Sequence, residues 1–412
     1  MVRGVLFAAD LHLHSRFSAA VSPAMTLENI ARWAQRKGVD LLGTGDCLQP
    51  QWQEEIEAQT IEAEPGLRRL RPEVEKTVQA RLPEGLHRSL RFLLSTEVNC
   101  VAPGTPERQG LHQLLYFPSL AVAREFAGRV AKLGDLQDGR PTLGISARQL
   151  LRGTGNFERI HQAPAHVMNP WFSALGVIGG ELALDQVYGE DTSRLLAVET
   201  GLTADPAMCR RIPDLDRCGL FSCSDAHSLE NLGRECTLLD VEPDYDAVMA
   251  ALRAGTSDRL RATHKFPLEL TRYYLNWCSK CKTAVEAKVC PQCGRALTMG
   301  SRDRLEKLRG VRPEPAWLKN QPASAAFRPL AYVIASVDGK KPDSVTVRRE
   351  AGQIVDQLAQ HERYILTEAT AGELMGVTRP EIAGAILNQR PGAISGDAEP
   401  KGRRLGQEAF GF

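Results

Sequence analysis

The chain has 412 residues, of which 43% are hydrophobic and 25% are charged, a composition typical of a globular protein with two or three domains or one large barrel with additions. No segment reaches the ~20 consecutive apolar residues of a membrane span, which excludes a transmembrane protein. The N-terminal VLFAA is too short for the apolar core of a signal peptide, so we expect a cytoplasmic protein whose ten cysteines form no disulfide framework.

The net charge of +1 conceals an uneven distribution. Residues 259–328 contain 15 Lys or Arg against 5 Asp or Glu, a balance of +10, so the rest of the chain has 36 against 45, a balance of −9. An acidic body joined to a basic segment is typical of a catalytic part combined with a part that binds a polyanion. A solvated basic linker would give the same pattern.

Residues 1–265 alternate short apolar runs with helical patterns. The run VLFAA predicts the first strand, and a helix follows in MTLENIARWAQRKG, where Thr26 can cap the N-terminus and Gly38 can end the helix. Further strands are predicted in VDLLGTGD, SLRFLLSTEVN, GLHQLLYFP, LAVETG and LFSCSDAH, with a charged helical excursion over residues 51–89. Repeated β–α units predict an α/β fold with a parallel sheet or barrel.

Side chains that bind metals lie where these strands end. His12 and His14 follow the first strand, and residues i and i+2 of a strand face the same side, so the two imidazoles should project together. A lone histidine or aspartate is more often structural, but the carboxyl ends of parallel barrel strands meet at one face, and the whole set predicts a metal site. The other candidates are Asp46, Glu97, His112, His166, Asp225 and His227, with Glu199 either as a ligand or as a carboxylate that orients a histidine.

The types of ligand in this set indicate the chemistry. Mixed imidazole and carboxylate ligands suit zinc or manganese, and iron is an open alternative. Clustered divalent cations lower the pKa of bound water and stabilise the charge that develops on a phosphoryl group. The sequence contains no Ser-His-Asp arrangement, P-loop or dinucleotide-binding fingerprint that would favour another reaction. The site therefore predicts hydrolysis of a phosphoester.

A compact cysteine module occupies residues 270–300. Its sequence WCSKCKTAVEAKVCPQCGRALT contains two CxxC pairs, a spacing typical of a zinc ribbon, and it lies inside the basic segment next to aromatic residues, which suits contacts with phosphates and stacked bases. A basic helix and linker are expected over 301–329, and a small mixed α/β domain with a mobile tail over 330–412. The four expected ligands of the structural Zn²⁺ are Cys278, Cys281, Cys290 and Cys293.

The elements DLHLHS, TGD, STEVN and SDAH, with the two histidines between them, resemble the PHP (polymerase and histidinol phosphatase) superfamily. The resemblance implies a distorted β/α barrel over residues 1–265 with two or three divalent metals, Zn²⁺, Mn²⁺ or Mg²⁺. The expected catalytic residues are Glu97, Asp225 and His227. The implied ligand sets are His12, His14, Glu97 and Asp225 for one metal; Glu97, His112 and His166 for a second; and Asp46 and His227 for a third, sparsely supplied one.

The sequence as a whole resembles the endonuclease Q family over most of its length. The resemblant stretches include DLHLHSRFSAAVSPAM, TGDCLQPQW, NPWFSALG, SDAHSLENLGRE and CPQCGRALTMGSRDRLEKL, in the order barrel, ribbon and small C-terminal domain. The resemblance implies a DNA-repair endonuclease that nicks the phosphodiester 5′ of deaminated bases (uracil, hypoxanthine, xanthine) and of abasic sites. Its partner is then DNA with such lesions, and a sliding clamp is a candidate for its recruitment.

Reading a single damaged base requires that the base leave the stack, and aromatic side chains near the metal site could replace its neighbours. Cations of the ribbon region could contact the phosphates. Core packing is an equal alternative for each tryptophan. The expected DNA contacts are Trp52, Trp171, Lys280, Lys282, Arg295, Arg302 and Arg304.

Two rival functions remain open. A PHP-type phosphoesterase for small molecules, of the histidinol-phosphatase kind, would use the same metals but would have little need of a basic ribbon. A non-catalytic nucleic-acid-binding protein would be consistent with one departure from the family pattern. Gln49 precedes Pro50 where the resemblance predicts a histidine, while Trp52 is retained.

Overall fold

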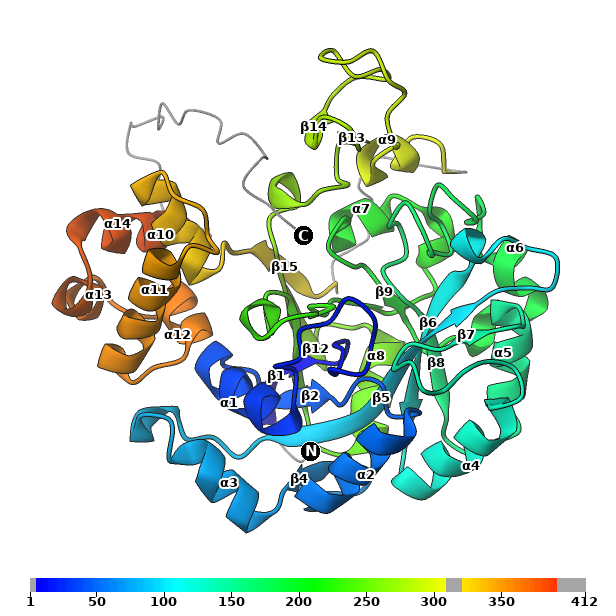
Figure 1. Ribbon diagram of the computed structural model, residues 1–412, viewed down its shortest axis with the longest axis horizontal. Coiled ribbons are helices and arrows are strands. Elements are labelled where there is room, and N and C mark those ends of the chain that lie inside the picture. The colour runs from blue at the N-terminus through cyan, green and yellow to red at the C-terminus, as the bar shows by residue number, and fades with distance from the viewer. Residues whose placement is uncertain (1–4, 309–320, 391–412) are drawn as a thin grey trace.

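The computed structural model describes residues 5–308 and 321–390, and the structural statements below concern these residues. They form a mixed α/β fold (Figure 1), in which no helix is both long and apolar enough to cross a membrane. The strands are β1 Val5–Asp10, β2 Leu41–Gly43, β3 Thr60–Glu62, β4 Arg68–Leu70, β5 Arg91–Cys100, β6 Leu111–Phe117, β7 Thr142–Leu143, β8 His161–Pro164, β9 Val198–Glu199, β10 Leu220–Phe221, β11 Cys236–Val241, β12 Leu260–Lys265, β13 Asn276–Cys278, β14 Thr283–Val285 and β15 Ala323–Ala326. The helices are α1 Leu27–Lys37, α2 Pro50–Gln59, α3 Pro72–Gln79, α4 Leu120–Val130, α5 Ala147–Thr154, α6 Leu184–Tyr188, α7 Pro206–Arg210, α8 Tyr245–Ala254, α9 Ser301–Leu305, α10 Leu330–Asp338, α11 Val345–Leu358, α12 Glu362–Thr367, α13 Ala371–Val377 and α14 Pro380–Asn388.

Eleven strands of the described chain form one large mixed sheet. Its path runs β15-β12-β11-β1-β2-β5-β4-β3, and β6, β7 and β8 extend it from β5. Strands β1, β2 and β5 are parallel, as the β–α units predict, whereas β6 pairs antiparallel with β5, and β11 with β1. The sheet is therefore mixed where a parallel sheet or barrel was expected. At β6 the reason is that the loop between β5 and β6 is shorter than the crossover that parallel pairing needs.

Backbone hydrogen bonds outside the paired strands of the large sheet connect its strands, with β9 and β10, in a ring. Just before β9, the Leu196 N–H donates to Gln162 O of β8 at 2.8 Å, and β9 pairs in parallel with β10. After β10, the Asp225 N–H donates to His12 O, which follows β1, at 2.9 Å. The strands β1, β2, β5, β6, β8, β9 and β10 therefore follow one another around a closed path.

Helix α1 illustrates how the local sequence sets these elements. Thr26 Oγ1 accepts a hydrogen bond from the Asn29 N–H at the N-terminus, and Gly38 ends the helix with φ of 81°, as predicted. The buried face of α1 belongs to the same apolar cluster as β2 and β5. The segment over residues 51–89 is helical in α2 and α3, but it also contains the hairpin β3–β4, which the sequence analysis did not predict.

The cysteine module forms a small sheet of its own. Strands β13 and β14 pair antiparallel, and isolated bridges join Trp277 to Thr298 and Val289 to Ala296. Helix α9, which corresponds to the expected basic helix, follows directly. Figure 1 shows β13, β14 and α9 together at the top of the view.

The described residues 330–390 form five helices and no strand, so the expected mixed α/β character of this region is wrong. The run LAYVIASVD is helix α10, and its Leu330, Val333 and Ile334 are buried among the neighbouring helices. A short apolar run of this kind is compatible with a strand or a buried helix, and periodicity alone does not separate them. The expected mobile tail, residues 391–412, and residues 309–320 of the expected linker lie outside the described residues.

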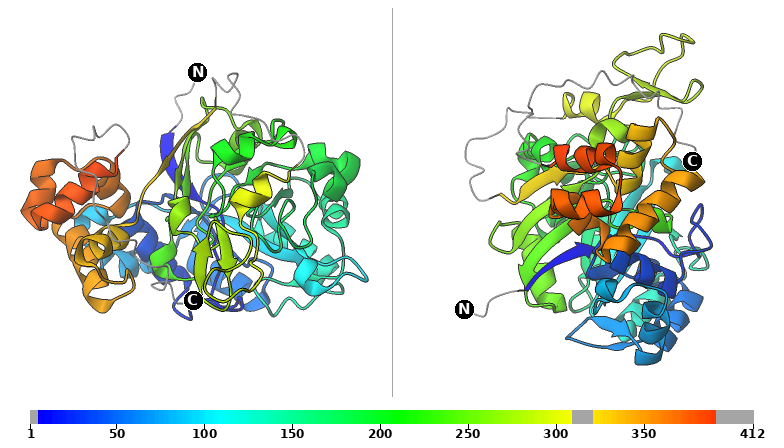
Figure 2. Two further views of the ribbon diagram at one scale, coloured as in Figure 1. Left: turned by 90° about the horizontal axis from the view of Figure 1, so that it is seen from above. Right: turned by 90° about the vertical axis from the view of Figure 1, so that its left-hand side faces the viewer.

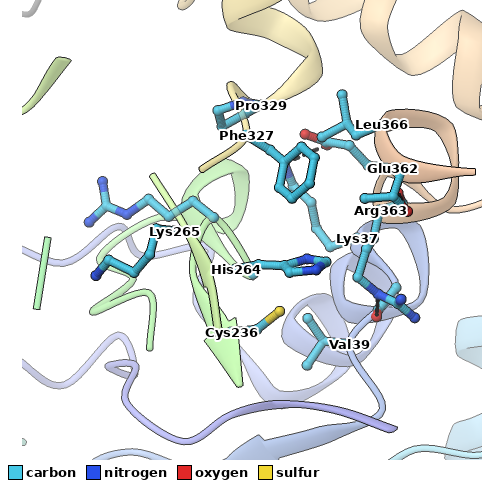
Figure 3. Close-up of a pocket in the computed structure, with 14 residues that line it drawn as sticks. Lys37, Val39, Cys236, His264, Lys265, Phe327, Pro329, Glu362, Arg363 and Leu366 are labelled. Carbon is cyan, nitrogen blue, oxygen red and sulfur yellow. Dashed lines mark hydrogen bonds and ion pairs between the residues drawn. The ribbon is translucent and has the colours of Figure 1, made fainter. Parts of the chain in front are cut away.

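These C-terminal helices lie beside α1 in all three views (Figures 1 and 2). The Lys37 Nζ lies 2.6 Å from Glu362 Oε2, and the Arg363 Nε donates to Gly38 O at 3.1 Å. A small cleft of about 30 Å³ remains between these side chains and His264 of β12 (Figure 3). One ion pair and one hydrogen bond thus join helix α12 and its N-terminal turn to the end of α1.

Candidate metal centre

His12 and His14 are each oriented by one buried carboxylate. Glu199 Oε1 lies 2.9 Å from His12 Nδ1, and Asp46 Oδ1 lies 3.1 Å from His14 Nδ1. In both rings the other nitrogen, Nε2, faces the interior of the site. Glu199 was expected either to bind a metal or to orient a histidine, and the geometry favours orientation of His12. Asp46 has the same position relative to the ring of His14.

Four side chains converge on one point at the end of β1. The Nε2 atoms of His12 and His14 both lie 3.4 Å from Asp225 Oδ1. His12 Nε2 also lies 3.6 Å from Glu97 Oε1, and His14 Nε2 lies 3.5 Å from Glu97 Oε2. Ligand atoms around a tetrahedral zinc are ~3.4 Å apart when each is about 2.1 Å from the ion. Both Nε2 atoms and Asp225 Oδ1 are buried without a hydrogen-bond partner, a deficit that a cation would satisfy. The donor set therefore fits a divalent cation.

A second group shares Glu97 with the first. Glu97 Oε1 lies 2.9 Å from His112 Nδ1 and 3.1 Å from His166 Nε2, and these two nitrogens are 3.3 Å apart. The other ring nitrogen of His166 lies 3.0 Å from Ser173 Oγ, which orients it. Glu97 thus stands between the two groups, where a carboxylate could bridge two cations.

The third expected set is not assembled as a separate cluster. His227 lies near His14 and Asp225, with one donor atom of each within 4.8 Å of the others, but both partners already belong to the first group. Asp46 does not join His227. Its Oδ2 instead accepts hydrogen bonds from the Ser15 N–H at 2.7 Å, from Ser15 Oγ at 2.6 Å and from Ser18 Oγ at 2.9 Å.

The backbone is unusual where several of these side chains are attached. Asp46, His166 and Asp225 have φ of 49°, 30° and 49°, in the region that favours glycine. Non-glycine residues are uncommon there, and such conformations persist where surrounding structure holds them, often at functional sites. At Gly201 an added Cβ would lie 2.4 Å from the Cβ of His166, so only glycine permits the close approach of this loop.

Buried charges dominate the electrostatics of the site. Burial opposes ionisation, yet the imidazoles of His112 and His12 hold the pKa of Glu97 well below its usual range. Burial would also lower the pKa of His14, but the carboxylates of Asp225, Asp46 and Glu97 that face its ring outweigh burial and raise that pKa to about 10. A cation that binds here must therefore displace protons from imidazoles, which couples metal binding to pH.

One cation in the site was missed by the sequence analysis. Arg140, on the loop before β7, places Nη1 3.3 Å from Glu97 Oε2. It precedes Pro141, belongs to no strand end and matches no metal-ligand pattern, so no spacing rule singled it out. The short DGRP sequence, typical of a turn, was the available signal.

The four ribbon cysteines also converge. Their sulfurs all lie within 4.8 Å of one another, and Cys278 Sγ is 3.6 Å from Cys293 Sγ. Sulfurs around a tetrahedral zinc are ~3.8 Å apart when each Zn–S bond is about 2.3 Å. A hydrogen bond from the Cys281 N–H lowers the pKa of Cys278 to about 6, which favours the thiolate that zinc requires. The donor set fits the expected structural zinc.

An open cavity of about 370 Å³ adjoins the metal centre. His166 and Asp225 line it at the centre, Arg234 and Arg272 supply positive charge, and the ribbon contributes Trp277. Its volume lies within the ~300–1,000 Å³ typical of ligand sites. Further aromatic lining residues are Phe266, Tyr273 and Tyr332, and the half-buried Trp171 packs edge-on against Tyr273 with ring centroids 4.7 Å apart.

Two of the expected DNA contacts are structural instead. Trp52 is completely buried, and its Nε1 donates to Gly45 O at 2.9 Å. Arg304 is also buried, with Nε on Leu175 O at 2.9 Å and Nη2 on Glu181 O at 2.8 Å. The prediction of DNA contact is wrong for both residues, because an indole and a guanidinium can each satisfy buried carbonyl groups.

The other basic candidates differ in how their charge is compensated. Arg302 is half-buried and contacts Glu286 Oε1 at 2.5 Å, which reduces its capacity for a phosphate. Lys280, Lys282 and Arg295 are exposed on the ribbon.

Gln49, the departure from the family pattern, caps a helix. It is buried, and its Oε1 accepts a hydrogen bond from the Trp52 N–H at 2.6 Å at the N-terminus of α2. Its side chain therefore satisfies a backbone donor, which an imidazole nitrogen could also do. This substitution leaves the two ligand groups around Glu97 intact.

The orienting role of Glu199 can be tested by Glu199→Gln. We expect metal affinity of the centre to fall ~10–100-fold, because the amide keeps the size of the side chain but removes the charge that holds His12. Competition with a graded series of chelators measures the affinity, with zinc in the ribbon as an internal reference. Glu158→Gln, at an exposed residue, is the matched control. Equal affinities in both variants would contradict the role.

Comparisons with known proteins extend over nearly the whole chain. No family model matches. An uncharacterized protein of Bacillus subtilis named YqxK is 27% identical over 94% of this chain and 95% of its own length. An uncharacterized protein of Methanocaldococcus jannaschii is 28% identical over 68% of this chain and 34% of its own length.

Two solved structures are similar throughout. The lesion-specific endonuclease PfuEndoQ of Pyrococcus furiosus matches with a TM-score of 0.78 and 28% identity, over 94% of this chain and 91% of that one. An endonuclease Q in complex with a 27-mer duplex that has an abasic lesion at the active site matches with a TM-score of 0.79 and 27% identity, over 93% of this chain and 91% of that one.

Proposed function

We propose that this chain, a member of the endonuclease Q family, is a metal-dependent DNA-repair endonuclease that nicks the phosphodiester 5′ of a deaminated base or an abasic site. The observation that supports the proposal most strongly is the similarity over nearly the whole chain to an endonuclease Q bound to an abasic duplex. The convergence of imidazoles and carboxylates around Glu97 agrees with it, since such donors suit the metals used in phosphodiester hydrolysis.

The proposed barrel is of the PHP type, closed by the ring of strands that begins with β1. Glu97 and Asp225 would bind cations together with the histidines of the two groups, while Glu199 and Asp46 would hold His12 and His14 in the required orientation. The bound cations (Zn²⁺, Mn²⁺ or Mg²⁺) would lower the pKa of a water molecule and stabilise negative charge on the phosphate.

The cavity beside the centre is the proposed place for the lesion nucleotide. A damaged base pairs weakly and leaves the stack at lower cost than a normal base, and aromatic walls can replace its lost stacking partners. Tyr273 and Trp277 would supply such a wall, and Trp171 would support it from behind.

The zinc ribbon would contact the phosphates outside the lesion. Its exposed Lys280, Lys282 and Arg295 are suited to the phosphate backbone, which is recognised without regard to sequence. The expected place of action is the nucleoid, and we assign no residue to recruitment by a sliding clamp.

The proposal is tested with end-labelled duplexes that contain one uracil, one hypoxanthine, one abasic site or no lesion. With Mg²⁺ or Mn²⁺ present, we expect a single nick immediately 5′ of the lesion, with 3′-hydroxyl and 5′-phosphate ends, and no nick in the undamaged duplex. Chelation should abolish the nick, and added metal should restore it. Turnover of a phosphate monoester without any nick would instead favour a small-molecule phosphoesterase.

A further inference from the structure

Among the arginines and lysines of the described residues, Arg140 is the one that contacts the carboxylate shared by the two metal-ligand groups. It lies on the loop between α4 and β7, with 25% of its side chain exposed, while Glu97 is fully buried. The arginine tip therefore enters the same space as the two groups.

The loop that supports Arg140 is locked to the site. The Gly139 N–H donates to Phe17 O at 3.0 Å, and the Asn99 N–H donates to Pro141 O at 2.9 Å. A Cβ added at Gly139 would lie 2.5 Å from both Asp46 Oδ2 and Ser18 Oγ, so only glycine allows this approach. The position of Arg140 is thus specified by the elements that orient His14.

The contact with Glu97 uses only a small part of the hydrogen-bonding capacity of Arg140. A guanidinium has five N–H groups in a planar fork, and one hydrogen bond of Arg140, at 3.3 Å, joins its side chain to the described residues. Glu97 already faces four imidazole nitrogens. The remaining donors of Arg140 are available to an anion placed over the two groups, and their fork matches two phosphate oxygens.

We propose that Arg140 is a catalytic residue that donates hydrogen bonds to non-bridging oxygens of the scissile phosphate. The third predicted set of metal ligands is incomplete, because Asp46 accepts hydrogen bonds from Ser15 and Ser18 instead. The guanidinium of Arg140 supplies a positive charge where a third cation would otherwise have done so. The inference rests on the proposed function and adds a residue to it.

The role follows from the charge balance of the reaction. During hydrolysis the oxygen of water bonds to phosphorus, the bond from phosphorus to the 3′ oxygen breaks, and that oxygen takes a proton. Negative charge rises on the non-bridging oxygens before the leaving group departs. Donors held in place before the reaction stabilise this charge most effectively.

The test compares Arg140→Ala and Arg140→Lys with the wild type and with Arg129→Ala. Arg129 is an exposed arginine of α4 paired with Glu125, so it controls for loss of a surface guanidinium. On the abasic duplex, we expect the single-turnover rate of Arg140→Ala to fall on the order of 10²–10³-fold. Arg140→Lys should recover part of this loss, because it restores the charge but not the fork.

Four further readouts separate catalysis from structural support. Metal content by elemental analysis and affinity for the duplex should stay within about twofold of the wild type, and added guanidinium chloride at non-denaturing concentration should rescue Arg140→Ala but not the wild type. Calorimetry with inorganic phosphate should show at least tenfold weaker binding by metal-loaded Arg140→Ala. An unchanged rate and unchanged phosphate affinity, or a lower metal content whose correction restores the rate, would overturn the inference.

Failure of this inference is distinguishable from failure of the proposed function. If the wild type nicks no duplex, the proposed function fails, while the same variants are still compared in phosphate binding and in hydrolysis of the activated diester bis(p-nitrophenyl) phosphate. A wild type that nicks lesions while Arg140→Ala matches it in every readout overturns the role of Arg140 alone. A wild type that neither binds phosphate nor cleaves either substrate overturns both.

Discussion

Asp225→Asn is expected to abolish nicking of an abasic duplex, with a loss on the order of 10³-fold or more, and to leave binding of that duplex within a few-fold of the wild type. Asp225 Oδ1 is the buried oxygen that both His12 and His14 face at 3.4 Å, and it has no hydrogen-bond partner. An amide in its place can still fill the space, but it binds a cation much less strongly than a carboxylate does. Changes behind a ligand typically cost ~10–100-fold, so removal of a ligand should cost more.

The asparagine substitution is chosen because Asp225 has φ of 49°, a conformation that asparagine tolerates well. A thermal melt close to that of the wild type would show that the variant folds. Gel-shift titration measures duplex binding, and Glu158→Gln again serves as the control. Nicking at the wild-type rate by a folded Asp225→Asn would remove Asp225 from the proposed metal centre.

Glu97→Gln is expected to empty both ligand groups together. The two oxygens of Glu97 face His12 and His14 on one side and His112 and His166 on the other, so the loss of one charge weakens two sites. The imidazoles that surround Glu97 cannot balance the positive charge of a bound cation, so without the carboxylate that charge is left uncompensated. We expect nicking to fall by ~10³-fold or more, again because a ligand is removed rather than a supporting group.

Elemental analysis of the purified variant measures this loss directly. The ribbon cysteines do not contact Glu97, so one zinc per chain should remain and provide an internal count. The metal of the centre should fall to near zero in Glu97→Gln, whereas Glu199→Gln should still load at high metal concentration. Full metal content in Glu97→Gln would contradict the bridging position, and equal losses in both variants would contradict the distinction between ligand and orienting group.

Local sequence patterns identified most of the residues that meet in the site. The HxH pair works because alternate residues of an extended chain face the same side, which needs no knowledge of the rest of the fold. His166 and Asp225 were found because strand ends gather at one edge of a sheet. Glu97 and His112 were predicted on the same ground, although the structure places Glu97 inside β5 and His112 at the start of the antiparallel β6. The two CxxC pairs predicted their own convergence, since each pair is a local turn. In the same way, Thr26 and Gly38 marked the ends of α1.

Roles that depend on contacts between distant segments could not be read from these patterns. Whether a carboxylate is a ligand or orients one is decided by which atom of which ring it faces, and only the folded chain brings Asp46 to His14 and Glu199 to His12. Trp52 and Arg304 have side chains suited to DNA, but packing places both against backbone carbonyl groups. Arg140 was not predicted because its place beside Glu97 depends on contacts of its loop with distant segments, such as those of Gly139 with Phe17 and of Pro141 with Asn99.

The sequence by itself determined the repeated β–α units, the caps of α1, the two groups of metal-binding side chains and the cysteine module, because periodicity, capping and ligand spacing are properties of short segments. Only the tertiary structure decided that the sheet is mixed, that the C-terminal region is helical, and which carboxylates orient the histidines. Each of these depends on the free energy of burying one segment against another that is remote in the chain, and an apolar run such as LAYVIASVD satisfies that requirement as a strand or as a helix.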